Sequence, residues 1–153
     1  MSVPSAALQT GHIGINVTDL DRSVEFYRQV FRFEVLSQSE PGADRRFAFL
    51  GQDGKLLLTL WQQSAGHFRA DSPGLHHLSF QAADIEAVQG FEKNLRELGV
   101  TLHYDGIVPH REGAPSGGVF FEDPDGTRLE IYSPTGADTA AAPVPGAPTC
   151  GFF

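Results

Sequence analysis

Two histidines lie in matching stretches of the sequence. His12 begins His-Ile-Gly-Ile-Asn-Val-Thr-Asp and His77 begins His-Leu-Ser-Phe-Gln-Ala-Ala-Asp, so an aspartate follows each histidine by seven residues. Each copy closes on an Asp-Gly turn and an apolar strand, and Glu130 lies five residues after the aspartate of the second turn. Imidazole and carboxylate groups are common ligands of transition metals. His12, His77 and Glu130 are therefore candidate metal ligands, and the first-copy equivalent of Glu130 is Leu58.

Equivalent positions of the two copies are expected to face one shared interior. A repeat of this length cannot bury its own apolar face and packs against its twin. Glu130 lies between Leu129 and Ile131, where a carboxylate without a partner would be unfavourable to bury. A metal ion bound by this carboxylate and by His12 and His77 would remove that cost. The matched positions favour this interpretation over ordinary core or surface histidines.

His76 and His77 are neighbours, so only one of them is expected to face the shared interior. Successive strand residues point to opposite faces of a sheet. The interval from His77 to Asp84 equals that from His12 to Asp19, which selects His77 as the ligand. His76 is expected on the outer face, against a helix or another subunit.

The periodicity of the sequence predicts the elements that position these residues. Alternation over residues 11–17 indicates a strand, and an amphipathic helix follows it. The second copy has the same order, with a helix over residues 84–98 that stops at Gly99. Each copy is therefore a β-α-β-β-β module, and residues 62–75 connect the two. The other predicted strands are 33–38, 46–50 and 55–61 in the first module and 76–82, about 100–104, 117–122 and 127–132 in the second.

The chain is expected to divide into an N-terminal extension, a two-module domain and a tail. Their ranges are 1–10, 11–134 (modules at about 11–62 and 76–134) and 135–153. The tail is rich in Ala, Pro, Gly and Thr without a period, which is typical of a segment outside the core. Its end, Cys150-Gly-Phe-Phe153, is expected to dock on this chain or on a partner subunit, because two phenylalanines gain little from water. A frayed end is the alternative.

Composition and charge exclude several classes of partner. The 153 residues are 41% hydrophobic and 20% charged, as in an ordinary globular domain. The net charge of −8 with only 11 Lys and Arg argues against nucleic-acid binding. We find no apolar run near 18 residues and no signal-peptide pattern at the start, so no membrane association is expected. One cysteine, Cys150, fits a reducing cytoplasm.

Two stretches resemble the vicinal oxygen chelate superfamily, which includes glyoxalase I, fosfomycin and bleomycin resistance proteins and extradiol dioxygenases. They are His12-Ile-Gly-Ile-Asn-Val-Thr-Asp-Leu-Asp-Arg-Ser-Val-Glu-Phe-Tyr27 and Phe120-Phe-Glu-Asp-Pro-Asp-Gly-Thr-Arg-Leu-Glu130, within a likeness that covers about residues 10–134. The resemblance implies an α+β fold in which two tandem β-α-β-β-β modules form a cupped, barrel-like mixed sheet around a metal site. One departure is Arg32, where the family usually has a glycine at the end of the first helix.

The ligand set that the resemblance implies is His12, His77 and Glu130, because Leu58 cannot bind a metal. Glyoxalase I and related epimerases have a carboxylate or amide at that position, which counts against their activity here. Two histidines and one carboxylate leave coordination positions open, as in extradiol dioxygenases with Fe(II) and fosfomycin thiol transferases with Mn(II). We expect Fe(II), with Mn(II), Zn(II) or Ni(II) as alternatives.

The resemblance also implies a catalytic loop. His110 lies in a loop comparable to the one that holds an assisting histidine in extradiol dioxygenases, and it is the candidate acid–base group. A solvated loop histidine is the alternative for His110. The family's tyrosine ten residues before the glutamate is Phe120 here.

Strand parity predicts an apolar wall and several polar side chains around the site. The predicted substrate-binding residues are Asn16, Phe49, Leu58, Gln81, Phe120 and Arg128.

These observations predict a cytoplasmic, homodimeric metalloenzyme. The reaction we expect is extradiol-type dioxygenation of a small apolar or phenolic substrate. A fosfomycin-type thiol transferase or hydrolase is weakened by the lack of a basic cluster for a phosphonate, since Arg128 is the one inward cation identified. A non-catalytic drug-binding protein of the bleomycin-resistance kind is weakened by the three metal-ligand types.

Overall fold

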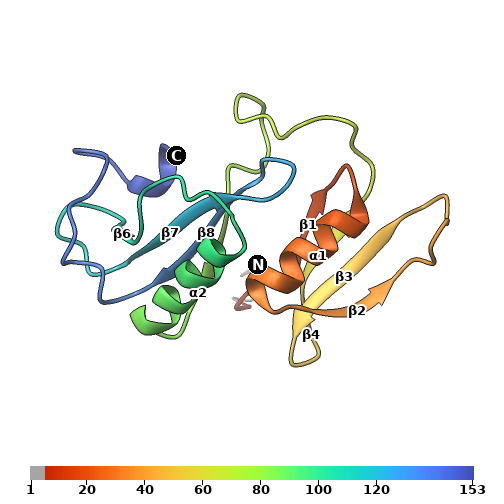
Figure 1. Cartoon of the computed structure of the whole chain (residues 1–153), viewed down its shortest axis with the longest axis horizontal. Helices are drawn as coiled ribbons and strands as arrows, with labels where there is room; N and C mark the ends of the chain where they lie inside the picture. The colour runs from red at the N-terminus through yellow and green to blue at the C-terminus, as the bar shows by residue number, and fades with distance from the viewer. Residues whose placement is uncertain (1–5) are drawn as a thin grey trace, which may run out of the picture. The chain divides into compact units, whose positions relative to one another are not determined.

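The computed structural model describes residues 6–153, and the chain in it divides into two compact units. The first unit ends at Ala65 and the second runs from Gly66 to Phe153. Each unit is a four-stranded sheet with one α-helix (Figure 1), so the predicted α+β fold of two tandem modules is confirmed. Neither α-helix in residues 6–153 has the length and apolarity needed to cross a bilayer.

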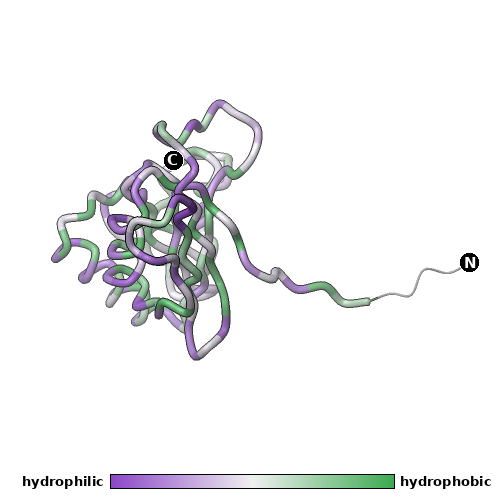
Figure 2. The backbone as a smooth tube through the Cα atoms, turned by 90° about the vertical axis from the view of Figure 1, so that its right-hand side faces the viewer, coloured by the Kyte–Doolittle hydropathy of each residue, from purple (hydrophilic) through white to green (hydrophobic). Residues whose placement is uncertain are grey.

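The first unit is a mixed sheet in the order β1-β4-β3-β2, in which β1 and β4 are parallel and the other pairs are antiparallel. Residues 6–12 precede the sheet without regular structure, and the tube in Figure 2 shows them extended away from β1. The elements of this unit are β1 (Ile13–Asn16), α1 (Leu20–Phe31), β2 (Glu34–Gln38), β3 (Phe47–Gln52) and β4 (Lys55–Trp61).

The second unit repeats this plan in the order β5-β8-β7-β6, with β5 and β8 parallel. The strand predicted at about 100–104 is wrong, because that stretch forms only an isolated bridge between Leu102 and Phe121. A shorter strand takes the edge position in its place. The elements of this unit are β5 (Leu78–Gln81), α2 (Ile85–Glu97), β6 (Val108–Pro109), β7 (Gly117–Glu122), β8 (Arg128–Ser133) and a 3-10 helix, η1 (Thr149–Gly151).

The aspartates that mark the repeat are the N-caps of the two helices. An oxygen of Asp19 accepts a hydrogen bond from the Arg22 amide at 3.0 Å, and an oxygen of Asp84 accepts one from the Ala87 amide at 2.9 Å. Each cap satisfies an amide that has no partner inside its helix. The seven residues from each histidine to its aspartate therefore contain one strand and end at the N-cap of the helix that follows.

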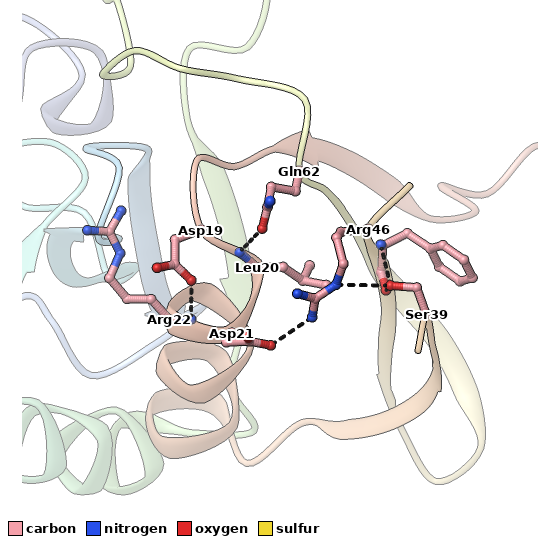
Figure 3. Close-up of polar contacts among 8 residues, drawn as sticks. Asp19, Leu20, Asp21, Arg22, Ser39, Arg46 and Gln62 are labelled. Carbon is pink, nitrogen blue, oxygen red and sulfur yellow. Dashed lines mark hydrogen bonds and ion pairs between the residues drawn. The ribbon is translucent and has the colours of Figure 1, made fainter. Parts of the chain in front are cut away.

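Polar contacts bind the start of α1 to the neighbouring strands of the first unit (Figure 3). The Leu20 amide donates to Gln62 Oε1 at 2.8 Å, just beyond β4. The Arg46 guanidinium donates to Asp21 at 2.8 Å and to Ser39 Oγ at 3.4 Å. These contacts hold α1 against its own sheet.

Helix α1 ends at Arg32, which adopts a left-handed conformation with φ of 61°. Its amide donates to the Arg28 carbonyl at 3.0 Å, so the turn that glycine makes in the family is kept without glycine. Helix α2 ends as predicted, with Gly99 at φ of 75° directly after the cap.

Candidate functional site

Glu130 lies at the centre of the second sheet. Its Cα pairs with Ser79 on β5 and with Phe120 on β7, so the three side chains share one row and one face of the sheet. The neighbours of Glu130 on β8 are fully buried and face the opposite side, where α2 packs against β7 and β8 (Figure 1). Only 2% of Glu130 is exposed, so this carboxylate needs polar partners.

Both carboxylate oxygens of Glu130 have such partners within the second unit. Ser79 Oγ donates to Oε1 at 2.5 Å, and His110 Nε2 lies 2.5 Å from Oε2. His110 Nδ1 lies 2.8 Å from Ser116 Oγ in turn. The result is a continuous polar chain from Ser116 through His110 and Glu130 to Ser79. The buried carboxylate of Glu130 therefore has partners from side chains of its own unit, and the predicted metal is not its sole possible partner.

His77 directly precedes β5, two residues before Ser79, and its ring meets that of Phe153 edge-on with centroids 5.8 Å apart. Burial lowers its pKa below the usual value, while the carboxylate of Glu130 acts in the opposite direction. The charges of His76, Arg128 and His110 add to the lowering. A lowered pKa keeps the imidazole neutral near pH 7, and the neutral imidazole is the form that binds metal ions.

The expected separation of His76 from His77 is wrong. His76 is exposed, yet its Nδ1 lies 2.8 Å from Nδ1 of His77, and the two ring centroids are 5.1 Å apart. Both residues precede β5, so the strand alternation that would turn them to opposite faces does not apply to them.

The donors of this region suit a transition-metal ion. The buried carboxylate of Glu130 and the neutral imidazole of His77, on which it acts electrostatically, are ligand types that such an ion prefers. Within residues 6–153 no three His, Cys, Asp or Glu side chains are already gathered as a ligand cluster. His12 lies in the first unit, exposed and directly before β1. Of the three predicted ligands, His77 and Glu130 belong to the second unit and His12 to the first.

The strand register of the first unit corrects the position of Leu58. In the second unit Ser79 pairs with Glu130, and in the first unit the matching residue, Gly14, pairs with Thr59. A β-bulge causes the difference, because Leu50 pairs with Leu58 while the next residue on β3 pairs with Leu56. The extra residue shifts everything after it by one position.

Thr59, rather than Leu58, is therefore the structural equivalent of Glu130. Leu58 is fully buried on the opposite face of β4, so it is excluded as a substrate-binding residue. Thr59 Oγ1 accepts a hydrogen bond from Trp61 Nε1 at 2.9 Å. The conclusion that the first unit offers no carboxylate at this position still holds.

Phe49 lies on the same face as Thr59, since the two are Cα partners. Its ring contacts Phe47 and Trp61, with centroid separations of 5.3 and 5.9 Å. All three rings are half-buried and form an apolar patch on that sheet face. Asn16 is exposed at the end of β1, where its Oδ1 accepts from the Gln63 amide at 2.8 Å.

The remaining predicted substrate-binding residues lie on the Glu130 face of the second unit. Gln81 is exposed, and its Oε1 accepts from the Tyr132 hydroxyl at 3.0 Å. Phe120 is fully buried, because the ring of Phe153 packs edge-on against it with centroids 4.8 Å apart. The Arg128 guanidinium lies over the same Phe153 ring, 5.6 Å from its centroid.

Sequence reasoning missed four residues that shape these faces. Ser116 and Thr59 gave no signal, because an isolated hydroxyl has no motif. Tyr104 contacts Phe120 with ring centroids 5.5 Å apart, and it comes from a stretch predicted as a strand. Phe153 was expected to dock, but its place beside Phe120 depends on long-range packing that periodicity does not encode.

Comparison with known proteins places this geometry in context. A family model described as the Glyoxalase/Bleomycin resistance protein/Dioxygenase superfamily matches residues 9–131. The chain is 26% identical over 130 residues to a catechol-2,3-dioxygenase of Bacillus subtilis (strain 168), covering 80% of this chain and 40% of that protein. It is 28% identical over 127 residues to a trivalent organoarsenical cleaving enzyme of Bacillus sp. (strain MD1), covering 82% and 73%. The chain thus spans less than half the length of the catechol dioxygenase.

A solved structure has the same fold. A mutant of the fosfomycin resistance protein FosX from Listeria monocytogenes, complexed with Mn(II) and 1S,2S-dihydroxypropylphosphonic acid, matches with a TM-score of 0.62. The two are 20% identical, and the match covers 82% of this chain and 92% of that one. This likeness is one of fold, and it includes a relative that binds a divalent metal.

Proposed function

Since the chain belongs to the Glyoxalase/Bleomycin resistance protein/Dioxygenase superfamily, we propose that it is a divalent-metal-dependent dioxygenase of the extradiol type. Its substrate would be a small apolar or phenolic compound. The proposed metal ligands are His12, His77 and Glu130, with Fe(II) as the metal. The observation that carries the proposal is the buried carboxylate of Glu130 beside His77, whose imidazole burial keeps neutral.

The ligand number supports a reaction that needs open coordination positions. Thr59 stands where the second unit has Glu130, so the repeat contributes one carboxylate rather than two. A divalent ion held by two imidazoles and one carboxylate would acidify vicinal substrate oxygens as a Lewis acid and leave a face open. The match to a catechol-2,3-dioxygenase favours this reaction within the superfamily.

The residues around Glu130 have separable roles in this proposal. Ser79 and His110 each bond one carboxylate oxygen and orient the ligand, and such outer partners tune metal affinity. His110 also touches Ser116, so both of its nitrogens are in hydrogen bonds and it can take a proton at one and release one at the other. We propose His110 as the proton carrier on this path. In the first unit, the apolar patch of Phe47, Phe49 and Trp61 has the makeup of a surface that favours aromatic ligands.

Metal binding is the first test of this proposal. Protein purified without air should retain about one divalent ion per chain by elemental analysis, and Glu130→Ala and His77→Ala should lose it. His67→Ala is the matched control, because that exposed histidine lies in the segment that connects the two modules and should change the affinity little. If wild-type protein binds neither Fe(II) nor Mn(II) after anaerobic addition, the proposal fails.

Turnover is the second test. Fe(II)-loaded protein should take up oxygen with a catechol or hydroxylated aromatic and give a ring-opened product. His110→Ala should slow this reaction by roughly a hundredfold or more if His110 carries the proton. Thiol addition to an epoxide with Mn(II), without oxygen uptake across the panel, would assign the site to a fosfomycin-type transferase instead.

A further inference from the structure

The segment Thr149–Phe153 is anchored beside the candidate site. The Thr149 amide donates to the His110 carbonyl at 2.8 Å, and Thr149 Oγ1 donates to the Pro109 carbonyl at 2.7 Å. Thr149 is fully buried, and the Tyr104 hydroxyl donates to its carbonyl at 3.4 Å. These bonds attach the segment to β6 and to the residue whose imidazole contacts Glu130.

From this anchor, the side chain of Phe153 reaches the Glu130 face of the sheet. Only 5% of Phe153 is exposed, whereas 64% of its neighbour Phe152 is exposed, so the fold buries one ring selectively. The Phe153 ring lies edge-on to Phe120 at 4.8 Å and to His77 at 5.8 Å between centroids. Phe120 is the Cα partner of Glu130. The ring is therefore next to the carboxylate row and in contact with a proposed metal ligand.

The surroundings of this ring are those of a bound aromatic ligand. His103 meets it edge-on at 5.6 Å, and the Arg128 guanidinium lies over its face at 5.6 Å from the centroid. Edge-on aromatic neighbours and a cation over the ring face are the two geometries that stabilise a π-system beyond its apolar burial. Any aromatic molecule that reaches Glu130 and His77 from this side meets the position that Phe153 fills.

We propose that the second unit carries an aromatic-ring subsite, formed by Phe120, His103, Arg128 and His77, and that Phe153 is its internal occupant. Segment 149–153 must withdraw before an aromatic ligand can bind there. This inference rests on the proposed function in one respect, since it names the class of substrate for the same site. The subsite itself needs no metal, because its contacts with the ring come from side chains.

A direct competition follows from internal occupancy. A ligand that must displace Phe153 binds with an apparent affinity equal to its intrinsic affinity multiplied by the fraction of molecules in which the subsite is vacant. Burial of a phenylalanine side chain favours the docked state by roughly tenfold or more. Removing the ring should therefore tighten the binding of an aromatic ligand by at least that factor.

The experiment uses 2-naphthol with the 153-residue chain in excess EDTA. This probe has one hydroxyl and is not a bidentate chelator, so its fluorescence titration reports ring binding whether or not the protein is a metalloenzyme. We expect Phe153→Ala to bind 2-naphthol about tenfold more tightly than wild type, and Phe152→Ala to stay within about twofold of wild type. Equal affinities in all three proteins, or weaker binding by Phe153→Ala, would overturn the proposal. Weaker binding would mean that the Phe153 ring contacts the bound ligand and does not compete with it.

Cys150 gives a second, independent measurement. It is the one cysteine of the chain, lies within η1 and packs against the cluster of Val108, Phe120 and Phe153. Saturating 2-naphthol should raise the rate of its alkylation by iodoacetamide in wild type, because the segment withdraws. Slower or unchanged alkylation on adding the probe would contradict displacement. Neither readout requires oxygen uptake, so a failed turnover assay would leave both intact.

Discussion

Replacing Thr59 and Leu58 in turn by glutamate tests the corrected strand register. Thr59 pairs with Gly14, as Glu130 pairs with Ser79, so Thr59→Glu restores the carboxylate that four-ligand members of the superfamily use. Leu58→Glu places the same group one residue away, on the opposite face of β4. The two variants carry the same charge and differ only in the face that receives it.

The two variants are expected to lower the free energy of unfolding for different reasons. Leu58 is fully buried, so Leu58→Glu loses its apolar burial and leaves a carboxylate without a partner. The free energy of unfolding should fall by about 3–5 kcal/mol. Thr59→Glu loses the hydrogen bond from Trp61, about 0.5–1.5 kcal/mol, and its carboxylate, at a position that is 2% exposed, has no hydroxyl partner of the kind that Ser79 gives Glu130. Gly14 opposite has no side chain, and a Cβ there would lie 3.1 Å from Thr59 Oγ1, so a side chain at residue 14 would contact residue 59 directly.

Metal affinity separates the variants further. A fourth ligand should tighten Mn(II) binding by roughly tenfold, which is about 1.4 kcal/mol, and should close an open position and lower oxygen-dependent turnover. Urea unfolding in EDTA measures the stability difference, and calorimetric titration with Mn(II) measures the affinity. Tighter Mn(II) binding by Leu58→Glu, with no gain in Thr59→Glu, would show that the bulge does not set the register and that Leu58 faces the site.

Three further predictions concern other parts of the chain. Arg32→Gly should raise the free energy of unfolding by about 0.5–1 kcal/mol, and the melting temperature by roughly 1–4 °C, because glycine adopts the observed φ of 61° without strain; an unchanged or lower melting temperature would refute this reading. Burial raises the pKa of the Cys150 thiol, so the thiolate fraction at pH 8 is smaller than in the unfolded chain; iodoacetamide should react more slowly with native than with urea-unfolded protein, and the native rate should keep rising above pH 9. We also predict that the protein is a homodimer at micromolar concentration. A monomer mass measured by light scattering after size exclusion would contradict this prediction.

The sequence predicted the module order, the end of α2 and the set of polar side chains that share the face of Glu130. These features depend on local signals: Asp84 caps α2, and Gly99 follows its end with a positive φ. Alternation in Arg-Leu-Glu-Ile-Tyr also assigns Glu130 to one face without ambiguity. The prediction therefore succeeded for these features, because local residue types and the alternation of polar and apolar residues determine them.

The bulge on β4 was not predictable in the same way. Residues 56–58 are three leucines, and Leu60 follows Thr59, so hydrophobicity alone does not tell which side chain faces which side. The Asp-Gly turns also give Leu58 and Glu130 the same offset, which suggested a register that the inserted residue breaks. Strand β6 escaped prediction because two residues have no period, and Pro109 suits it to the sheet edge.

With the corrected register, the two modules can be compared residue by residue. The row Gly14–Thr59–Phe49 in the first unit corresponds to Ser79–Glu130–Phe120 in the second. The first row has a threonine at its central position and a glycine beside it; the second has a carboxylate at that position and, beside it, the hydroxyl that bonds it. A carboxylate moved alone to Thr59 would lack the hydroxyl partner that Ser79 gives Glu130. Thr59→Glu combined with Gly14→Ser should therefore bind metal more tightly than Thr59→Glu alone, if outer partners orient the ligand as they do at Glu130. Equal affinity of the single and double variants would show that the hydroxyl serves only to compensate a buried charge.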